Sequence, residues 1–154
     1  MAQYYSKETA GYSANPVVKP ASPAYGGRVR RYRASLDLSA VNLTTGTTGN
    51  VGTSDSVILA RIPAGATFDF GCITSSVTLG SAVVAIGTNP VHASNGQYRA
   101  AATFTAVDTP TLFGAAAAQS GAALASDTLI YLTCATAALP TSGTLVVDLY
   151  FNQP

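Results

Sequence analysis

The sequence is poor in charge, because only 10% of its 154 residues are Asp, Glu, Lys or Arg, against about 25% in an ordinary soluble domain. This scarcity does not come from a membrane segment. The longest alanine-rich stretch, residues 114–125, is interrupted by polar residues and falls short of the roughly 18 apolar residues that predict a membrane-spanning helix. The first eleven residues lack the apolar core of a signal peptide. We therefore expect no membrane association.

Residues that usually carry chemistry are equally scarce. The chain has one histidine, His92, one glutamate, Glu8, and two cysteines, Cys72 and Cys134. His92 lies in a predicted surface loop without a nucleophile or carboxylate motif, and the cysteines lack the spacing of a zinc site. The cysteines lie in apolar segments and are expected to be buried thiols; one disulfide is the alternative and would need an oxidising compartment. The sequence predicts no catalytic residue, no metal and no cofactor.

Four of the aspartates are expected to have structural roles. Asp55 and Asp127 lie in predicted turns, where a carboxylate accepts hydrogen bonds from nearby backbone N–H groups. Asp37 and Asp148 lie within strand patterns and can pair with arginines. The candidate partners are Arg61, Arg99 and the arginines of residues 28–33.

Eight short segments have the composition and alternation of β-strands. They are residues 28–38, 56–62, 67–75, 81–86, 98–105, 111–113, 128–134 and 144–151. Short strands separated by Gly, Pro and Asn turns every 8–12 residues are typical of a β-sandwich or barrel. The alanine run after residue 113 predicts at most one or two helical turns, because Gly121 divides it. We predict an all-β fold, a jelly-roll-like or Greek-key β-sandwich of about 7–8 short strands, over residues 28–154.

The first 27 residues differ from the rest. Three prolines exclude a helix or a central strand and predict an extended N-terminal arm. Disordered linkers are usually poor in aromatic residues, whereas this segment has four tyrosines that could anchor it on another surface. A disordered tail, or one folded back on its own domain, is the alternative. The candidate partner-binding tyrosines are Tyr4, Tyr5, Tyr12 and Tyr25.

Positive charge is concentrated at the front of the chain. Six basic residues and one acid give residues 1–33 a net charge of +5, and two arginines and six aspartates give the remainder −4. Strand alternation places Arg28 and Arg30 on one face and Arg31 and Arg33 on the other. A groove for nucleic acid would prefer one face, whereas Arg and Tyr are enriched anchors of protein interfaces. A protein partner is therefore favoured over a solvated or self-paired strand and over nucleic acid.

The predicted sandwich carries Thr, Ser and Ala where solvated strands usually carry Lys or Glu, as in residues 81–85. Such faces are cheap to desolvate, because no charge has to be buried. They suit close neighbours, either copies of the same chain or a large partner. An ordinary solvated β protein with little charge is the alternative.

Four segments resemble small virion proteins of tailed bacteriophages. They are VILARIPAGATF at 57–68, LGSA at 79–82, VAIGT at 84–88 and GTLVVDLY at 143–150. The similarity extends over roughly residues 30–151 and consists of turn chemistry and strand alternation. Such proteins resemble head decoration (cement) proteins, β-rich modules that bind the outside of the capsid. The resemblance implies a structural virion protein on the capsid surface, assembled in the host cytoplasm, with the major capsid protein as partner and a trimer as its oligomeric state. It carries over no catalytic residue.

Three other functions remain open from the sequence. A coat subunit would use the arginines on packaged nucleic acid. Another phage part, such as a head fibre base or a minor tail protein, could have the same sandwich. A carbohydrate-binding module would need exposed aromatic rings, but most of those in the predicted domain lie at strand positions expected to be buried. Those positions are Phe68, Phe70, Phe104, Tyr131 and Phe151.

Overall fold

The computed structural model describes residues 28–39 and 51–153, which form eight strands. They are β1 Arg28–Asp37, β2 Ser56–Ile62, β3 Thr67–Ser75, β4 Val83–Gly87, β5 Arg99–Thr103, β6 Thr111–Phe113, β7 Thr128–Ala135 and β8 Thr144–Gln153. A short 3₁₀ helix, His92–Ser94, lies between β4 and β5. In the described residues, no helix is long and apolar enough to cross a membrane. The predicted strands are confirmed, with shifts of one or two residues at several ends.

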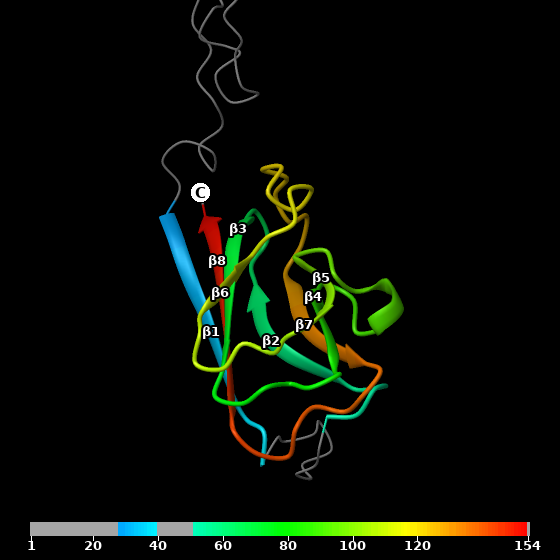
Figure 1. The fold of residues 1–154 in the computed structure, drawn as a ribbon. Helices are drawn as coiled ribbons and strands as arrows, with labels where there is room; N and C mark the ends of the chain where they lie inside the picture. Colours follow the sequence, from blue (N-terminus) through cyan, green and yellow to red (C-terminus); the bar gives the residue numbers. More distant parts are fainter. Residues whose placement is uncertain (1–27, 40–50, 154) are drawn as a thin grey trace, which may run out of the picture.

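The strands form two four-stranded sheets packed face to face (Figure 1). One has the order β1-β8-β3-β6 and the other β2-β7-β4-β5, and all neighbouring pairs are antiparallel. Only the β4–β5 connection stays within one sheet; each other connection crosses to the opposite sheet. This order is that of a jelly roll, which confirms the predicted fold class. The predicted arm, residues 1–27, and its boundary with the sandwich lie outside the described residues.

Alternation along the strands produces the core between the sheets. Ile73 of β3, Ile130 and Leu132 of β7, and Leu149 and Phe151 of β8 have no exposed surface. Three rings close the core at one end of the sandwich. Phe151 packs edge-on against Phe68 and Tyr98, at centroid distances of 5.4 and 5.7 Å, and Phe68 lies 4.3 Å from Tyr98. Burial of these apolar side chains is the main stabilising contribution to the fold.

At two positions, the backbone conformation or the close packing of a neighbour requires glycine. Gly80 has a φ of +62° in the turn before β4, a conformation that favours glycine. Gly71, in the middle of β3, faces the ring of Phe113 on β6. A Cβ added there would lie 2.2 Å from that ring, so the glycine lets β6 pack closely against β3.

The two cysteines lie in different sheets and are both free. Cys134 on β7 is buried, as predicted, and its thiol lies 3.0 Å from the carbonyl of Gly52. Cys72 is only partly buried, because it lies on the outer face of its sheet, opposite Asp148 of β8. The expectation of burial was therefore wrong for Cys72.

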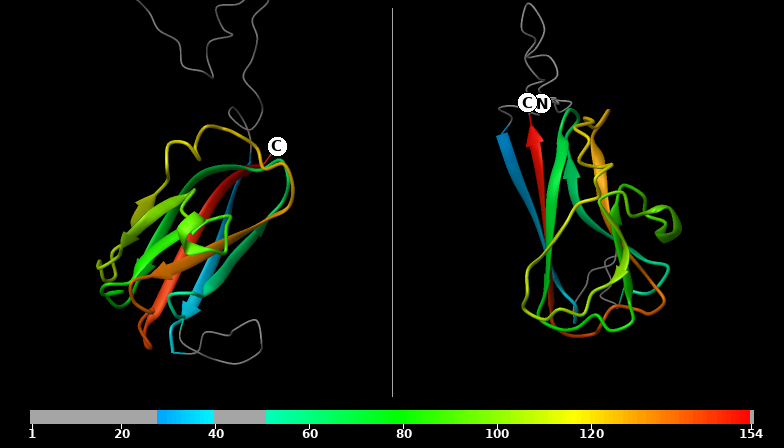
Figure 2. Two further views of the ribbon diagram at one scale, coloured as in Figure 1. Left: turned by 90° about the vertical axis from the view of Figure 1, so that its right-hand side faces the viewer. Right: turned by 45° about the horizontal axis from the view of Figure 1, so that its top comes forward.

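The alanine-rich connection between β6 and β7 contains only a short turn, as predicted. The N–H groups of Ala118 and Gln119 both donate to the carbonyl of Ala115, at 2.9 and 3.1 Å. This connection lies at the end of the sandwich where β1 begins and β8 ends, as two views agree (Figures 1 and 2). Arg28 pairs there with Gln153.

Candidate protein-binding surface

The arginine-rich segment forms β1, which lies at the edge of its sheet. β1 pairs with β8 in an unbroken register of ten residues, from Arg28 opposite Gln153 to Asp37 opposite Thr144. Within residues 28–39 and 51–153, no strand pairs with the other side of β1. The strand therefore presents a free backbone edge together with its arginines, a combination that can both repel copies of itself and accept an acidic partner.

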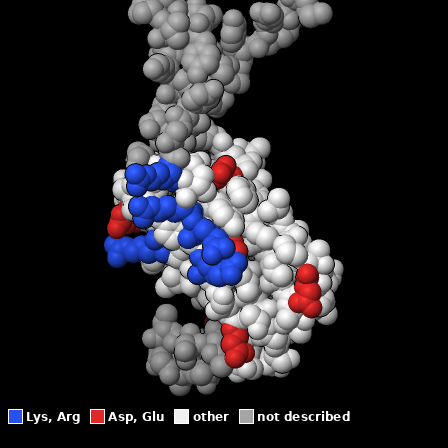
Figure 3. All heavy atoms as spheres, turned by 90° about the vertical axis from the view of Figure 1, so that its left-hand side faces the viewer, with Lys and Arg blue, Asp and Glu red and all other residues white. Residues whose placement is uncertain are grey.

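Alternation divides the arginines as the sequence predicted. Tyr32, Ala34 and Leu36 pack against the core, so Arg31 and Arg33 point to the outer face of the sheet. Arg28 and Arg30 have the inward parity of Tyr32, but both are exposed. The space-filling view shows Lys and Arg gathered over one part of the face that contains the β1 edge (Figure 3). The rest of that face is mostly uncharged.

Arg33 is engaged within the molecule. Its Nε and Nη2 donate to Oδ1 and Oδ2 of Asp148 on β8, at 2.8 and 2.7 Å. The Asp148 side chain is 11% exposed and that of Arg33 is 51% exposed. The hydrogen bonds from Arg33 hold the pKa of Asp148 below its usual value, against the effect of burial. The pair fixes the edge strand β1 to β8. The predicted pairing of Asp148 with the arginine strand is confirmed.

The other three arginines of β1 have no such partner. Among the described residues, the only ion pairs are Arg33 with Asp148 and Arg61 with Asp127. Within the described residues, Arg28, Arg30 and Arg31 are thus exposed side chains outside any ion pair.

Arg31 lies beside an aromatic pair on the same outer face. It is opposite Tyr150 of β8, whose ring stacks on Phe70 of β3 with centroids 4.4 Å apart and planes inclined by 16°. Farther across the sheet, Leu112 of β6 is 70% exposed. The guanidinium, the two rings and the leucine form a surface with the composition of an interface core. We refer to Arg31, Phe70, Tyr150 and Leu112 as the outer-face patch.

The sequence did not predict this patch. Phe70 and Tyr131 were expected to be buried, but both are only partly so. A β-bulge between Phe68 and Phe70 puts these two residues on opposite faces of the sheet. Tyr131 alternates with the buried Ile130 and Leu132, so it must point outward. The predicted burial of Phe68, Phe104 and Phe151 is confirmed.

The remaining candidate residues have structural partners. Asp55 accepts the N–H of Gly52 at 2.7 Å, as predicted for a turn aspartate. Asp127 accepts the N–H of Ala64 at 3.1 Å and also pairs with Arg61 at 3.2 Å. Asp37 does not pair with an arginine; it accepts the N–H and hydroxyl of Ser39 instead, which lowers its pKa.

His92 is half-buried in its loop, with Nδ1 3.1 Å from the hydroxyl of Thr133 on β7. Asn95 donates to the same hydroxyl at 3.0 Å and to the carbonyl of Tyr131 at 3.2 Å. These contacts fasten the loop to the outer face of the second sheet. In the part of the chain that the structure describes, no three His, Cys, Asp or Glu residues lie together as metal ligands. Tyr4, Tyr5, Tyr12 and Tyr25 lie outside the described residues.

Comparison with known proteins finds likeness in structure alone. No family model and no curated protein matches the sequence. A chain of the cyanophage Pam1 capsid asymmetric unit superposes with a TM-score of 0.59 at 17% identity, covering 84% of this chain and 88% of that one. A chain of the Ralstonia phage GP4 capsid gives 0.57 at 14% identity, covering 84% and 86%. A chain of the acidic stable capsid of Helicobacter pylori bacteriophage KHP30 gives 0.52 at 11%, covering 82% and 89%. The likeness is one of fold.

Proposed function

We propose that this chain is a structural protein of a bacteriophage particle, and within it a decoration protein that binds the outer surface of the capsid. The observation that carries the proposal is the fold. Three solved phage capsid structures each contain a chain of this shape, matched over more than four-fifths of both chains. The β1 edge and the outer-face patch form a surface suited to binding another protein, which supports a structural role.

The binding surface in this proposal is the β1 edge and the outer-face patch. Arg28, Arg30 and Arg31 supply positive charge that matches acidic loops of a major capsid protein, in bidentate contacts where geometry allows. The patch supplies aromatic and aliphatic area that is cheap to desolvate, because only Arg31 in it is charged. Tyr4, Tyr5, Tyr12 and Tyr25 would extend the contact to neighbouring capsid subunits.

The stabilising mechanism is binding linkage. A protein that binds across several subunits of the assembled shell, and not to separated subunits, favours the assembled state. Binding as a trimer would add avidity, because the second and third contacts become intramolecular. The trimer is what the resemblance to decoration proteins implies. Measuring the mass of the protein in solution tests this oligomeric state.

Deletion of residues 1–27 tests the role of the arm. We expect the truncated protein to keep its sandwich and to lose capsid binding, measured by co-sedimentation with heads from which the protein has been stripped. Circular dichroism and thermal unfolding check the fold independently. Undiminished occupancy on heads by the truncated protein would contradict the role of the arm.

The location of the protein on the phage particle distinguishes a decoration protein from the other phage parts. Antibody raised against the chain should label the whole outer surface of intact heads in electron micrographs. Labelling confined to the tail or to a fibre base would favour those parts, and labelling only after heads are opened would favour an internal coat segment. Binding to a glycan array, without any label on phage particles, would favour a carbohydrate-binding module.

A further inference from the structure

Among the strands that the structure describes, β1 forms the most open sheet edge. It has ten residues and pairs with β8 without a bulge, whereas the edge strands β5 and β6 have five and three residues. The fourth edge strand, β2, has seven residues, and a bulge between Ile58 and Ala60 interrupts its pairing. Short or bulged edges discourage the addition of another strand, and β1 has neither feature. It is therefore the edge best suited to accept a further strand (Figure 1).

The backbone of β1 provides the groups for such an addition. In an antiparallel pair, the N–H and C=O groups of alternate residues point toward the partner strand, and those of the other residues point away. Roughly five of the residues of β1 therefore direct both groups away from β8. None of residues 28–39 and 51–153 forms a strand on that side. An extended peptide can bind such an edge through main-chain hydrogen bonds, while its side chains determine the specificity.

The exposed arginines indicate which peptide fits. Alternation puts Arg28 and Arg30 on one face of β1 and Arg31 on the other, the face of Val29, which is 55% exposed. Side chains directly opposite each other on neighbouring strands have Cβ atoms about 5 Å apart, so an arginine can pair with a carboxylate there. In an antiparallel added strand, the residues opposite positions 31, 30, 29 and 28 are consecutive. The matching sequence is therefore acidic, acidic, apolar, acidic.

Pairing between two copies through β1 is less favourable. Two copies that join antiparallel at the same edge keep their outer faces on the same side, so each outward residue lies opposite an outward residue. The two registers that join the most residues place Arg33 opposite Arg33 or opposite Arg31. Like charges directly opposite each other destabilise a sheet. The charge of β1 thus favours an acidic strand over a second copy.

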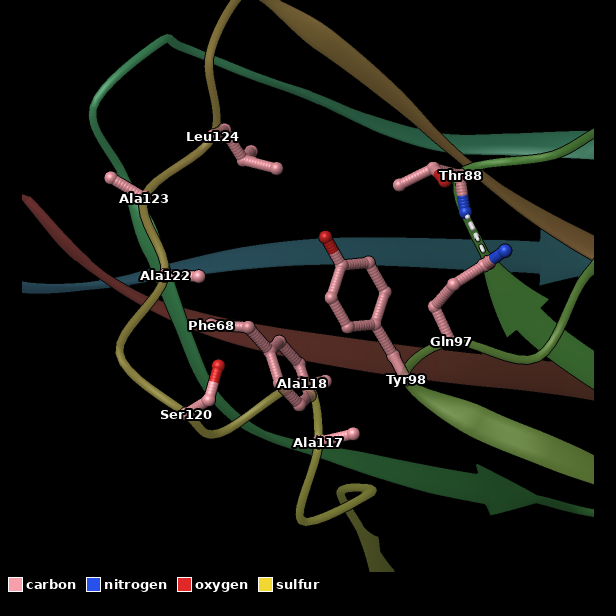
Figure 4. A pocket seen from close by; sticks show the side chains of 10 residues that line it. All are labelled: Phe68, Thr88, Gln97, Tyr98, Ala117, Ala118, Ser120, Ala122, Ala123 and Leu124. Carbon is pink, nitrogen blue, oxygen red and sulfur yellow. Dashed lines mark hydrogen bonds between the residues drawn. The ribbon is translucent and has the colours of Figure 1, made fainter.

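A mostly apolar pocket near the start of β3 does not match the same partner. Its volume is about 350 Å³, and Phe68, Tyr98 and Leu124 lie around it together with smaller residues (Figure 4). Among the described residues, no charged side chain lines it. A carboxylate buried there would have no opposite charge beside it, which is unfavourable. An acidic segment therefore fits the β1 edge and not this pocket.

We propose that β1 binds an extended acidic segment of a partner protein as a further antiparallel strand, with acidic side chains opposite Arg31, Arg30 and Arg28. This rests on the proposed function in one respect, because the capsid protein is taken as the source of the segment. The strand addition itself requires only the β1 edge. Main-chain hydrogen bonds hold the segment, and the ion pairs determine its register and direction.

Peptides test the strand addition on the full chain without capsids. The probe is an extended peptide of threonine and valine, as long as β1, that contains Glu-Glu-Val-Glu and carries fluorescein for anisotropy measurements. Two versions are N-methylated at alternate residues, one at the odd and one at the even positions. Only one of these sets of N–H groups can point toward β1. We therefore expect one version to bind about tenfold more weakly or worse, and the other to bind like the parent peptide. Equal affinities of the two versions, or no binding of the parent peptide, would overturn the proposal.

Charge variants test the register. Arg30→Glu should weaken binding of the parent peptide several-fold, and a peptide with Glu-Lys-Val-Glu should recover that loss on the variant. Arg61→Glu makes the same charge change on β2 and should leave the affinity of the parent peptide unchanged. A peptide with the reversed order, Glu-Val-Glu-Glu, should bind the parent protein several-fold more weakly. Equal binding of the two orders, or no recovery by the lysine peptide, would contradict the antiparallel register and with it the proposal.

Other molecules at the β1 edge would give different results. Oligothymidylate that displaces the labelled peptide at lower concentration than the unlabelled peptide does would assign the edge to nucleic acid. Peptide binding only at protein concentrations where a larger assembly dissociates would assign it to a second copy. Either result would overturn the proposal. If heads are labelled by antibody but the methylated peptides bind equally, the decoration role stands and the strand addition fails. If the peptides behave as expected but no head is labelled, the strand addition stands and the decoration role fails.

Discussion

The two sheets end in edge strands that use arginine in opposite ways. Arg99, at the start of β5, is partly buried and donates to carbonyls of its own hairpin: those of Val84, Ala102 and Thr103, the last two at 3.2 Å. Burial lowers its pKa, but the three acceptors keep the guanidinium satisfied. On β1, Arg28, Arg30 and Arg31 have no ion-pair partner among the described residues.

The comparison distinguishes an arginine that stabilises the fold from one that is exposed to a binding partner. An arginine bound to carbonyls of its own hairpin stabilises the edge and offers little to a partner. An exposed arginine on a long regular edge contributes little to stability, since its charge is already solvated in the free protein. Sequence alone does not separate these cases, because both arginines lie in strand-like segments. The hydrogen bonds of the folded chain distinguish them, because they show which arginine has acceptors within its own hairpin.

The largest expected effect is on binding at the β1 edge. Arg31→Glu should weaken capsid binding by about 30-fold, the loss expected for one arginine anchor of about 2 kcal/mol at an interface. Arg61→Glu makes the same charge change on β2, at a side chain already paired with Asp127, and should have a much smaller effect. Co-sedimentation with stripped heads at two salt concentrations measures both. Equal losses in the two variants would mean that net charge, and not the outer-face patch, controls binding.

The next effect is on stability at the β5 edge. Arg99→Ala should lower the free energy of unfolding by about 1–3 kcal/mol, because it removes the donor to three carbonyls of the β4–β5 hairpin. Arg31→Ala should stay within about 0.5 kcal/mol of the parent protein, as is usual for exposed positions. Urea denaturation followed by circular dichroism gives both values. A larger loss for Arg31→Ala than for Arg99→Ala would reverse the assignment of the two edges.

The strands could be predicted because local chemistry determined them. β2, β3 and β6 begin and end where their alternating residues meet turn residues such as Pro63 and Gly65. β4 begins two residues later than expected, because Ala82 belongs to the preceding turn and donates to the carbonyl of Leu79 at 3.1 Å. The existence of a strand can be predicted from its local sequence. The residue at which it begins or ends depends on which backbone groups form hydrogen bonds in the adjacent turn.

The candidate surface could be predicted only in part. The alternation of side chains along β1 correctly predicted that Arg31 and Arg33 lie on one face of the strand and Arg28 and Arg30 on the other. The pairing of Arg33 with Asp148, 115 residues away, depends on the β1–β8 register, which no short pattern in the sequence encodes. The outward turn of Phe70 depends on a bulge that places Asp69 as an extra residue in β3. Long-range pairing and a single bulge therefore decided which side chains form the outer-face patch.

The smallest expected effect concerns the pair that fastens β1 to β8. Arg33 holds the pKa of Asp148 below its ordinary value, so the pair stabilises the fold at neutral pH. This contribution is lost as the pH falls from about 3.9, the ordinary aspartate pKa, through the lowered value in the folded protein. Arg33→Gln should remove the part of the stability loss at acidic pH that comes from Asp148. The pKa of Asp37 is also lowered, by Ser39, but Asp37 is unchanged in both proteins and cancels in their comparison. Urea denaturation at pH 7 and pH 3 should show a smaller drop in the free energy of unfolding for Arg33→Gln than for the parent protein, and equal drops would mean that the pair does not secure the edge strand.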